Sequence, residues 1–241
     1  MPLTPDRLKA SLQVEMASVG VSPTLSQIDL LARYLDLISR WRTRARLTAI
    51  TDPRAAARLH VADSLLCLRA GIPAGASLLD VGSGAGLPGI PLAIVRHDLD
   101  VTLLEAESRK AAFLEVVASE LGLRISVACA AAEDAARGPL REQFDVTVAR
   151  AVAPLAALCE LTLPFVKVGG LAALLKGPSV RAEMGDGRAA ARALGGSDPD
   201  VSEWSLGGGE RRVLVVIRKR ESTPRGFPRR AGLPRRRPIK G

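Results

Sequence analysis

The sequence predicts an α/β fold, in which a doubly wound sheet follows an N-terminal helical cap and ends in an antiparallel hairpin. Three observations lead to this prediction. Residues 1–73 carry helical patterns, strand-length apolar runs then alternate with helix-length segments, and a glycine-rich turn separates the last two runs. Such alternation implies parallel strands joined by helices on both faces of a sheet. The length of 241 residues suits one such domain with a small appendage.

The cap, residues 1–73, is expected to consist of helices. Its clearest apolar stripe at helical spacing is formed by Leu30, Leu31, Tyr34, Leu35, Leu37, Ile38 and Trp41. A later helix is predicted to begin at Pro53 with Asp52 as its N-cap, because proline suits the first helical turn and an aspartate accepts from unpaired backbone N–H groups. It is expected to end near Gly71.

We expect the sheet and its hairpin within residues 74–220. The five predicted parallel strands are the apolar runs 77–81, 101–104, 125–128, 144–148 and 171–175. Runs that are apolar throughout are typical of strands buried on both faces. Helices are predicted at 107–121 and 154–166. Two further runs, 201–206 and 211–217, flank three glycines, which indicates an antiparallel hairpin.

The tail, residues 221–241, is basic and rich in proline and glycine. Residues 218–241 hold ten basic side chains and one acid, which leaves 24 basic and 24 acidic residues elsewhere, so the formal net charge of +9 resides in this stretch. Such a cluster favours a polyanionic partner, with nucleic acid first, over a merely solubilising end. We expect the tail to be extended when free and to become ordered on its partner.

Composition excludes several other classes of protein. The three cysteines lie far apart without a CxxC pair, and there are two histidines, so we expect neither a disulfide scaffold nor a metal site. We see no signal peptide, and no apolar run approaches the ~18 residues that a membrane helix needs. The expected protein is soluble, cytoplasmic, free of membrane contact and monomeric, since the fold needs no partner.

A glycine-rich turn after the first predicted strand marks a ligand site. Residues 80–91 read DVGSGAGLPGIP. Glycines let the backbone turn sharply and approach a ligand closely, and in doubly wound sheets such turns lie where ligands bind. The stretch from Gly84 to Gly89 also matches GxGxxG, so a dinucleotide site and a turn without a ligand are the alternatives.

Asp80 separates these alternatives. A carboxylate directly before the glycines would lie near the diphosphate of a dinucleotide, whereas it suits the ammonium and sulfonium groups of S-adenosylmethionine. Glu105, 25 residues further on, can accept both ribose hydroxyls of either ligand. We therefore place the methyl donor first, the dinucleotide second and the turn without a ligand third.

Three charged side chains follow the later strands. For Glu133, spacing alone favours a solvated acid at a helix start over a contact with an adenine. Arg150 and Lys176 end the fourth and fifth predicted strands, at the expected floor of the site. Each is equally well explained as a contact to substrate or donor and as an ordinary ion pair.

The chain resembles the glucose-inhibited-division protein B family, the RsmG-type methyltransferases, over most of its length. Its most specific segment is 78–92, with Gly-Leu-Pro-Gly-Ile-Pro. The other matching elements are His60 with Asp63 and Ser64, 103–106, Arg109-Lys110, Phe113-Leu114, Ala132-Glu133, 149–151, Pro154-Leu155, Leu163-Pro164, 175–177, 212–217 and 227–234. The resemblance implies a Rossmann-like class I methyltransferase sheet. It also implies an enzyme that methylates N7 of a guanine in small-subunit (16S) ribosomal RNA with S-adenosylmethionine.

The resemblance also implies which residues contact the donor and the RNA. The donor contacts that it implies are Gly82, Leu87, Glu105, Ala106, Glu107, Ala132, Glu133 and Arg150. The turn itself adds Asp80, Gly84 and Gly86. The residues expected to face ribosomal RNA or the small subunit are His60, Arg211, Arg229, Arg230, Arg235 and Arg236. For His60, a packed and hydrogen-bonded role is the more common outcome.

No catalytic side chain is expected. Guanine N7 carries an in-plane lone pair and no proton, so it needs no general base, and catalysis would come from aligning donor and acceptor. Arg150 and Lys176 are therefore candidates for contacts on the substrate side.

The chain departs from the family at the presumed RNA-facing edge. Arg42 and Arg46 replace asparagines, and Leu59 replaces an arginine, although Arg58 is adjacent. These changes leave the donor site intact but alter base recognition. An RNA- or ribosome-binding paralogue with altered or lost activity is therefore the second hypothesis, and a dinucleotide-dependent oxidoreductase the third.

Overall fold

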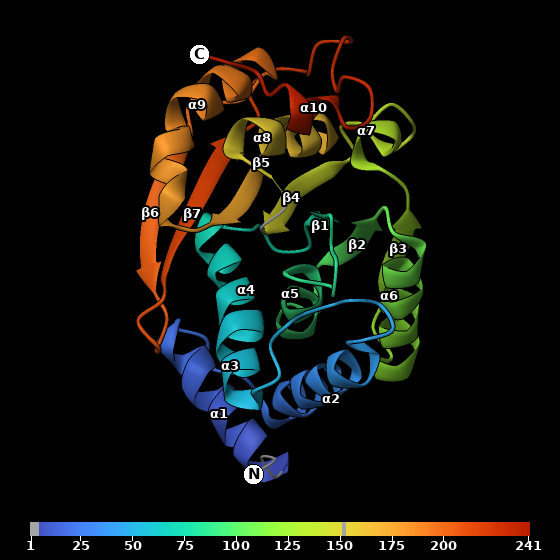
Figure 1. Ribbon diagram of the computed structural model, residues 1–241, viewed down its shortest axis with the longest axis vertical. Coiled ribbons are helices and arrows are strands. Elements are labelled where there is room, and N and C mark those ends of the chain that lie inside the picture. The colour runs from blue at the N-terminus through green and yellow to red at the C-terminus, as the bar shows by residue number, and fades with distance from the viewer. Residues whose placement is uncertain (1–4, 151–152) are drawn as a thin grey trace.

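The computed structural model describes residues 5–150 and 153–241. Its centre is a seven-stranded sheet (Figure 1) with the order β3-β2-β1-β4-β5-β7-β6. The strands are β1 (Ser77–Val81), β2 (Asp100–Glu105), β3 (Ile125–Cys129), β4 (Phe144–Arg150), β5 (Val166–Lys176), β6 (Asp200–Ser205) and β7 (Arg211–Arg218). The first five are parallel, and β7 lies antiparallel between β5 and β6. The predicted doubly wound sheet and its C-terminal hairpin are confirmed.

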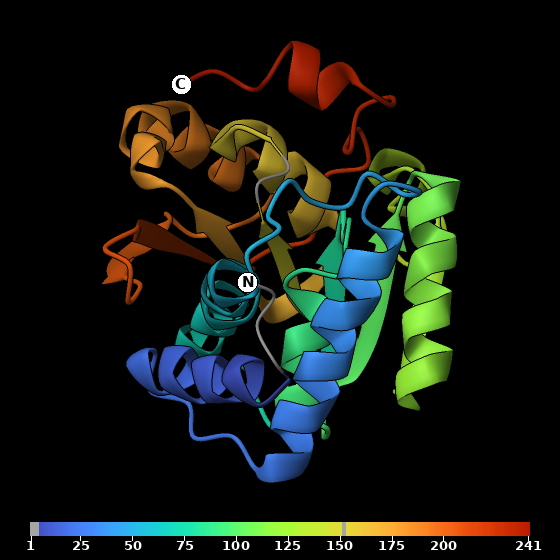
Figure 2. The same cartoon turned by 60° about the horizontal axis from the view of Figure 1, so that its bottom comes forward.

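Helices cover both faces of the sheet (Figures 1 and 2). The elements of one face are the cap, α5 (Gly89–Val95) and α6 (Ser108–Leu121); those of the other are α7 (Ala132–Ala135), α8 (Leu155–Thr162) and α9 (Met184–Ala193). Successive strand residues alternate between two apolar clusters: Leu78 packs with the cap, and Leu79 packs with α8 and α9. This alternation explains why the strands read as continuous apolar runs.

The cap contains α1 (Pro5–Ser18), α2 (Leu25–Trp41) and a continuous helical segment from Pro53 to Ala70. The successive parts of that segment are α3 (Pro53–Ala56), a π-helical turn η1 (Ala57–Ala62), α4 (Asp63–Leu65) and a 3-10 turn η2 (Leu66–Ala70). The predicted N-cap at Asp52 is confirmed, because its Oδ2 accepts from Ala55 N at 2.7 Å. Gly71 ends the segment at φ 75°, a backbone angle that favours glycine. No helix among the described residues is long and apolar enough to cross a membrane.

One predicted helix ends early. Instead of continuing to residue 166, α8 stops at Thr162 and a 3-10 turn, η3 (Leu163–Phe165), leads into β5. Pro164 lacks the N–H that a longer helix would need.

The tail is folded against the body rather than extended, which corrects the sequence-based expectation. It carries a short helix, α10 (Leu233–Arg236), and lies across α8 and α7. Arg141 donates to the carbonyl oxygens of Thr223 at 2.6 Å and Phe227 at 2.7 Å. The sequence of the tail does not reveal these contacts, because Arg141 belongs to a distant part of the chain.

Candidate functional site

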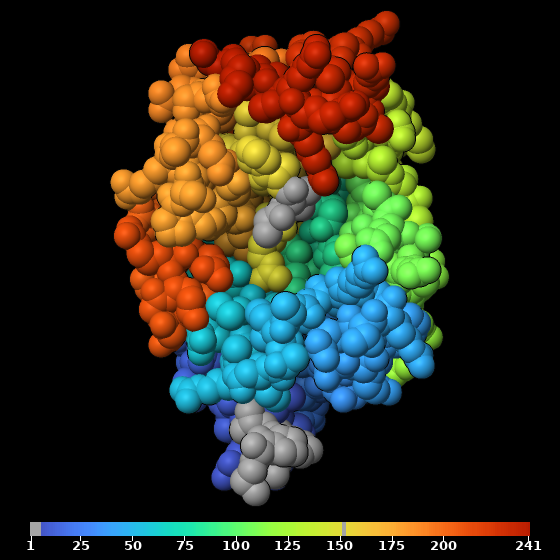
Figure 3. Space-filling model, viewed as in Figure 1, coloured from blue at the N-terminus to red at the C-terminus, as the bar shows by residue number. Residues whose placement is uncertain are grey.

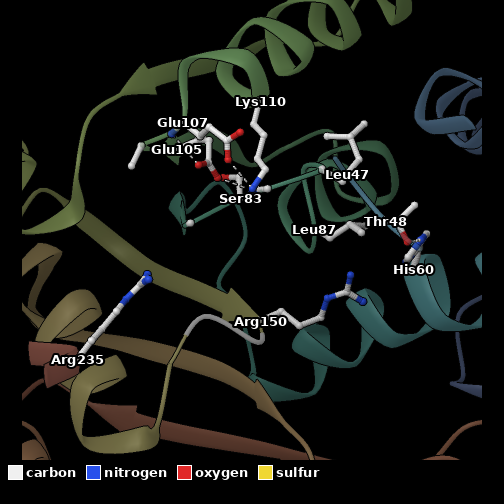
Figure 4. Close-up of a pocket in the computed structure, with 14 residues that line it drawn as sticks. Leu47, Thr48, His60, Ser83, Leu87, Glu105, Glu107, Lys110, Arg150 and Arg235 are labelled. Carbon is white, nitrogen blue, oxygen red and sulfur yellow. Dashed lines mark hydrogen bonds and ion pairs between the residues drawn. The ribbon is translucent and has the colours of Figure 1, made fainter. Parts of the chain in front are cut away.

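The carboxyl ends of β1, β2 and β4 open into a cavity of about 760 Å³, which we call the main cavity. Its lining consists of Leu47, Thr48, His60, Gly82, Ser83, Gly84, Ala85, Leu87, Glu105, Ala106, Glu107, Lys110, Arg150 and Arg235. Figure 3 shows the hollow in the surface between the cap and the tail, and Figure 4 shows the side chains around it. This is the position at which doubly wound sheets bind ligands.

The glycine loop, residues 82–87, forms the floor of the main cavity. Gly82, Gly84 and Gly86 have φ values of 72°, 58° and 91°, which strongly favour glycine. The amides of Gly82 and Ser83 donate to Leu104 O at 2.8 and 3.1 Å, so the loop is tied to the end of β2. A Cβ on Gly86 would lie 2.2 Å from Ile90 Cδ1, so this glycine serves close packing below the loop.

Glu105 joins the glycine loop to the segment after β2. Its Oε2 accepts from Gly84 N at 2.8 Å and its Oε1 accepts from Glu107 N at 2.9 Å. The side chain is buried but lines the main cavity (Figure 4). Each carboxylate oxygen has a further lone pair, so Glu105 can still accept two hydroxyls from a ligand.

Asp80 lies beneath the glycine loop and does not line the main cavity. It is fully buried, and its Oδ2 accepts from Gly89 N, at the start of α5, at 2.9 Å. Burial raises the pKa of Asp80 to about 7. The structure thus corrects the argument that Asp80 faces the charge of a ligand. Its carboxyl group instead holds the loop against α5.

Tyr34 connects the cap to the same loop, a contact that sequence reasoning missed. Its hydroxyl donates to Ala85 O at 2.7 Å, and both groups are buried. The apolar spacing of α2 identified Tyr34 as a core residue, but nothing in that pattern revealed the partner of its hydroxyl.

A charged cluster lies beside the main cavity, and Arg150 is the member that lines it. Arg150 Nη1 donates to Leu59 O at 2.6 Å and to Asp63 Oδ2 at 2.9 Å. Arg212 Nε donates to the other oxygen of Asp63, also at 2.9 Å. The Asp63 side chain is 5% exposed, so one buried carboxylate holds two guanidinium groups. The sequence indicated Arg150 but not Arg212.

His60 lies beside this cluster. Its Nε2 is 3.1 Å from Thr48 Oγ1, and its Nδ1 is buried without a partner among the described residues. Burial and the nearby charge of Arg150 lower the pKa of His60 to about 4, so the imidazole is neutral at pH 7. His60 therefore has the packed, hydrogen-bonded role that we expected, and it also lines the main cavity.

A smaller cavity of about 370 Å³, the side cavity, adjoins the main one. Its lining consists of Ile50, Leu59, His60, Asp63, Arg150, Leu175, Lys176, Gly177, Ser179 and Arg212. Lys176 lines this cavity and not the main one; its Nζ donates to Ala153 O at 2.9 Å and pairs with Glu183 at 2.8 Å. His60 and Arg150 line both cavities.

Glu133 and Ala132 lie outside the lining of the main cavity. Glu133 is buried, and its Oε1 accepts from Gly232 N of the tail at 2.8 Å. Ala132 packs against the apolar cluster around α8. The interpretation of Glu133 as a solvated acid at a helix start, which spacing alone favoured, is thus wrong. Its carboxylate anchors the tail.

The arginines expected to face RNA have different positions. Arg235 lines the main cavity, and Arg230 and Arg236 are exposed. Arg229 instead pairs with the fully buried Glu160 at 2.6 Å, and Arg211 pairs with Glu203 at 2.6 Å. Arg229 is thereby held by a buried carboxylate, whereas Arg211 has a side chain that is 60% exposed, and its contact with RNA stays a prediction.

The positions that depart from the resemblance lie within the cap. Arg42 and Arg46 belong to the segment after α2, where Arg46 is exposed and has φ 49°. Arg58 pairs with Glu210 at 2.9 Å and therefore does not take the place of an arginine at Leu59. Ala151, part of the resemblance, lies outside the described residues.

Comparison with known proteins identifies the family. Residues 27–213 match the family described as GidB: rRNA small subunit methyltransferase G. A relative from Symbiobacterium thermophilum, named ribosomal RNA small subunit methyltransferase G, is 40% identical over 95% of this chain and 96% of its own. One of the same name from a Roseiflexus species is 45% identical over 88% and 92%. The solved structure of a methyltransferase from Pyrococcus furiosus shares the fold, with a TM-score of 0.53 and 16% identity over 80% of this chain and 99% of that one.

Proposed function

The chain belongs to the GidB family of rRNA small subunit methyltransferases, and from this premise we propose how its main cavity, its side cavity and its surface serve that activity. The reaction is transfer of a methyl group from S-adenosylmethionine to N7 of a guanine in small-subunit (16S) ribosomal RNA. The main cavity holds the donor. The observation that carries this assignment is Glu105, whose carboxylate spans the glycine loop and the segment after β2 at the wall of that cavity.

The donor site follows from the residues around Glu105. Its two oxygens are placed to accept the ribose hydroxyls, while their backbone donors fix the orientation of the carboxylate. Gly82, Gly84 and Leu87 provide the close backbone surface, and Ala106 and Glu107 continue the wall. Asp80 and Gly86 support the loop from below.

Glu133 fits an indirect role in the donor site. Because it anchors Gly232, it sets the path of the segment that brings Arg235 to the main cavity. A contact between Glu133 and the adenine would require the tail amide to share or leave the carboxylate.

The chemistry asks little of the side chains. S-adenosylmethionine, when bound, would supply a methyl group on a positively charged sulfur, with the S–C electron pair staying on sulfur and the N7 lone pair forming the new bond. No proton moves. The role left to the cavity walls is to hold the two partners in line.

The carboxylate of Asp63 reduces the positive charge near the reacting purine. Positive charge passes to the purine ring as the N7 bond forms, and carboxylates near the ring stabilise it. Asp63 offsets one of the two positive charges of Arg150 and Arg212, and His60 is neutral at pH 7. The wall is therefore less cationic than its arginine content suggests.

Transfer of labelled methyl groups tests this function. We expect the protein to label small-subunit RNA, offered both naked and in the assembled subunit, at a guanine and to fail when that guanine is replaced by 7-deazaguanine, which lacks N7. Label at another atom would contradict N7 as the acceptor. RNA binding without any label would instead support the binding paralogue that Arg42 and Arg46 suggested.

A further inference from the structure

The side cavity is placed to hold the acceptor of the reaction. Methyl transfer requires donor and acceptor in line at about 3–3.5 Å, so an acceptor site must lie directly beside the donor site. The main and side cavities share His60 and Arg150. The volume of about 370 Å³ lies within the range of small-molecule sites.

The walls of the side cavity combine apolar faces with fixed hydrogen-bond donors. Ile50, Leu59 and Leu175 provide apolar surface, as the flat face of a base requires. Its cations are Arg150, Lys176 and Arg212, and each has a carboxylate partner. Because these partners hold the cations in place, the donors that remain are preorganised rather than mobile.

Arg150 has donors left over at the wall between the two cavities. Its Nη1 has two hydrogens, which go to Leu59 O and Asp63 Oδ2. Its Nε and Nη2 have no hydrogen-bond partner within residues 5–150 and 153–241. Figure 4 shows the guanidinium group extending from the end of β4 towards Leu87 and His60.

We propose that the side cavity receives the target guanine with N7 towards the main cavity, and that Arg150 selects guanine by donating to O6. This inference rests on the proposed function. Guanine presents N7 and O6 as neighbouring acceptors on one edge, whereas adenine presents an amino donor in place of O6. An adenine in the same position would set this amino group against the Arg150 donors.

Lys176 and Arg212 complete the site. They lie in the side cavity and not in the main one, so they contact the nucleotide rather than the donor. Lys176 Nζ has three hydrogens and two partners, Ala153 O and Glu183, which leaves one hydrogen for a phosphate or sugar oxygen. Asp63 acts here as a positioning residue, because it holds Arg150 and Arg212 on either side of itself.

Gly177→Leu tests the location. Gly177 lines the side cavity but not the main one. Its φ of −87° suits any residue, and a Cβ there meets nothing within 4 Å. A leucine side chain therefore fits the fold and takes up space at the side cavity. We expect unchanged S-adenosylhomocysteine affinity and unchanged melting temperature, with methyl transfer reduced by about 100-fold or more, since a blocked site loses the alignment of acceptor and donor.

Gly185→Leu is the matched control. It adds the same side chain at an exposed glycine of α9, where a Cβ also meets nothing within 4 Å. We expect it to transfer methyl groups at the rate of the unchanged protein. Full transfer activity in Gly177→Leu would overturn the assignment, and so would a loss of S-adenosylhomocysteine binding, which would place Gly177 at the donor site.

Arg150→Gln tests the selection of guanine. We expect the guanine-over-adenine ratio of kcat/KM, measured on RNA with either base at the target position, to fall about 10- to 100-fold, as for other lost base-reading contacts. Arg150→Lys, which keeps the charge near Asp63, should lose part of the ratio. An equal loss on both bases in both variants would show a merely structural role.

Failure of the two proposals can be told apart. If the unchanged protein labels neither naked RNA nor the assembled subunit, the proposed function fails. If it labels a guanine but Gly177→Leu does so equally well, only the acceptor site is wrong.

Discussion

At the scale of single residues, Glu105 is the side chain most directly tied to the donor. Glu105→Gln keeps the size and one acceptor but loses the charge that the Gly84 and Glu107 amides now meet. Charge-assisted hydrogen bonds contribute roughly 1.5–3 kcal/mol each, so loss of one corresponds to about a 10- to 100-fold weaker affinity for S-adenosylhomocysteine, measured by calorimetry. Glu115→Gln, at an exposed position of α6 outside the lining of the main cavity, is the control. Equal affinities in the two variants would remove Glu105 from the donor site.

Asp80 makes stability depend on pH. Its carboxyl group loses a proton near pH ~3.9 when unfolded, but burial raises the folded pKa to about 7. Between these values the folded state binds more protons, so the free energy of unfolding falls as pH rises. The total decrease in the free energy of unfolding is on the order of 4 kcal/mol and is complete above pH 7.

Asp80→Asn isolates this contribution. The asparagine can still accept from Gly89 N but does not titrate. We expect urea unfolding from pH 4 to pH 8 to show the unchanged protein losing stability relative to the variant as pH rises through this range. Parallel pH profiles would show that Asp80 does not hold a proton in the fold.

The residues of the site were only partly accessible from the sequence. Glu105 and the glycines could be predicted, because strand ends and positive-φ turns leave a local pattern. Asp80 could not be placed correctly, since its position in the chain does not reveal that its carboxyl turns towards Gly89. Arg229 was misassigned for a similar reason: its partner, Glu160, lies on a helix that reads as core.

At the scale of elements, α2 supports the glycine loop through one hydrogen bond. Tyr34→Phe removes the donor and leaves the buried Ala85 carbonyl unpaired, which should cost about 1–3 kcal/mol in the free energy of unfolding. We expect weaker donor binding as well, because the loop loses its support from the cap. Denaturation and donor titration check both effects. Unchanged values in both would mean that the loop keeps its conformation without the cap.

The tail is held by the ion pair between Arg229 and Glu160. Arg229→Ala leaves a fully buried carboxylate without its cation, which should cost about 3 kcal/mol in unfolding free energy. The tail should also become a substrate for trypsin, seen as early cleavage within residues 225–237. Arg230→Ala, at an exposed neighbour, should change neither stability nor cleavage of the rest of the tail. Equal protection of the two variants would exclude the anchoring role.

Most elements were predictable, and β5 shows where prediction stopped. Only residues 171–175 looked like a strand, whereas β5 starts at Val166. The register shifts between Phe144 and Val146 of β4, and Gly170 lies where a Cβ would be 2.4 Å from Asp145 O. A glycine at such a close approach interrupts the apolar pattern without ending the strand.

At the scale of the whole molecule, charge governs RNA binding. The basic excess lies in the C-terminal stretch, where most of the arginines are exposed and Arg235 lines the main cavity. Affinity should therefore fall linearly on a log–log plot against salt between roughly 50 and 200 mM. Replacing Arg230 and Arg237 with Gln should lower the slope by about 1.4, or about 0.7 for each single-strand contact.

A matched pair of substitutions tests whether position matters. Arg7 and Arg124 are exposed and lie away from the cavity lining, so changing both to Gln alters the net charge equally. Their slope should match that of the unchanged protein. If filter-binding titrations showed a similar decrease of the log–log slope in both double variants, net charge alone would attract the RNA.

The hydrogen bond from Tyr34 to the glycine loop also bears on cooperativity. It connects α2 of the cap directly to the glycine loop that forms the floor of the main cavity. Thermodynamic linkage is reciprocal, so any gain in donor affinity caused by ribosomal RNA resting on the cap must be returned as an equal gain in RNA affinity when the donor is present.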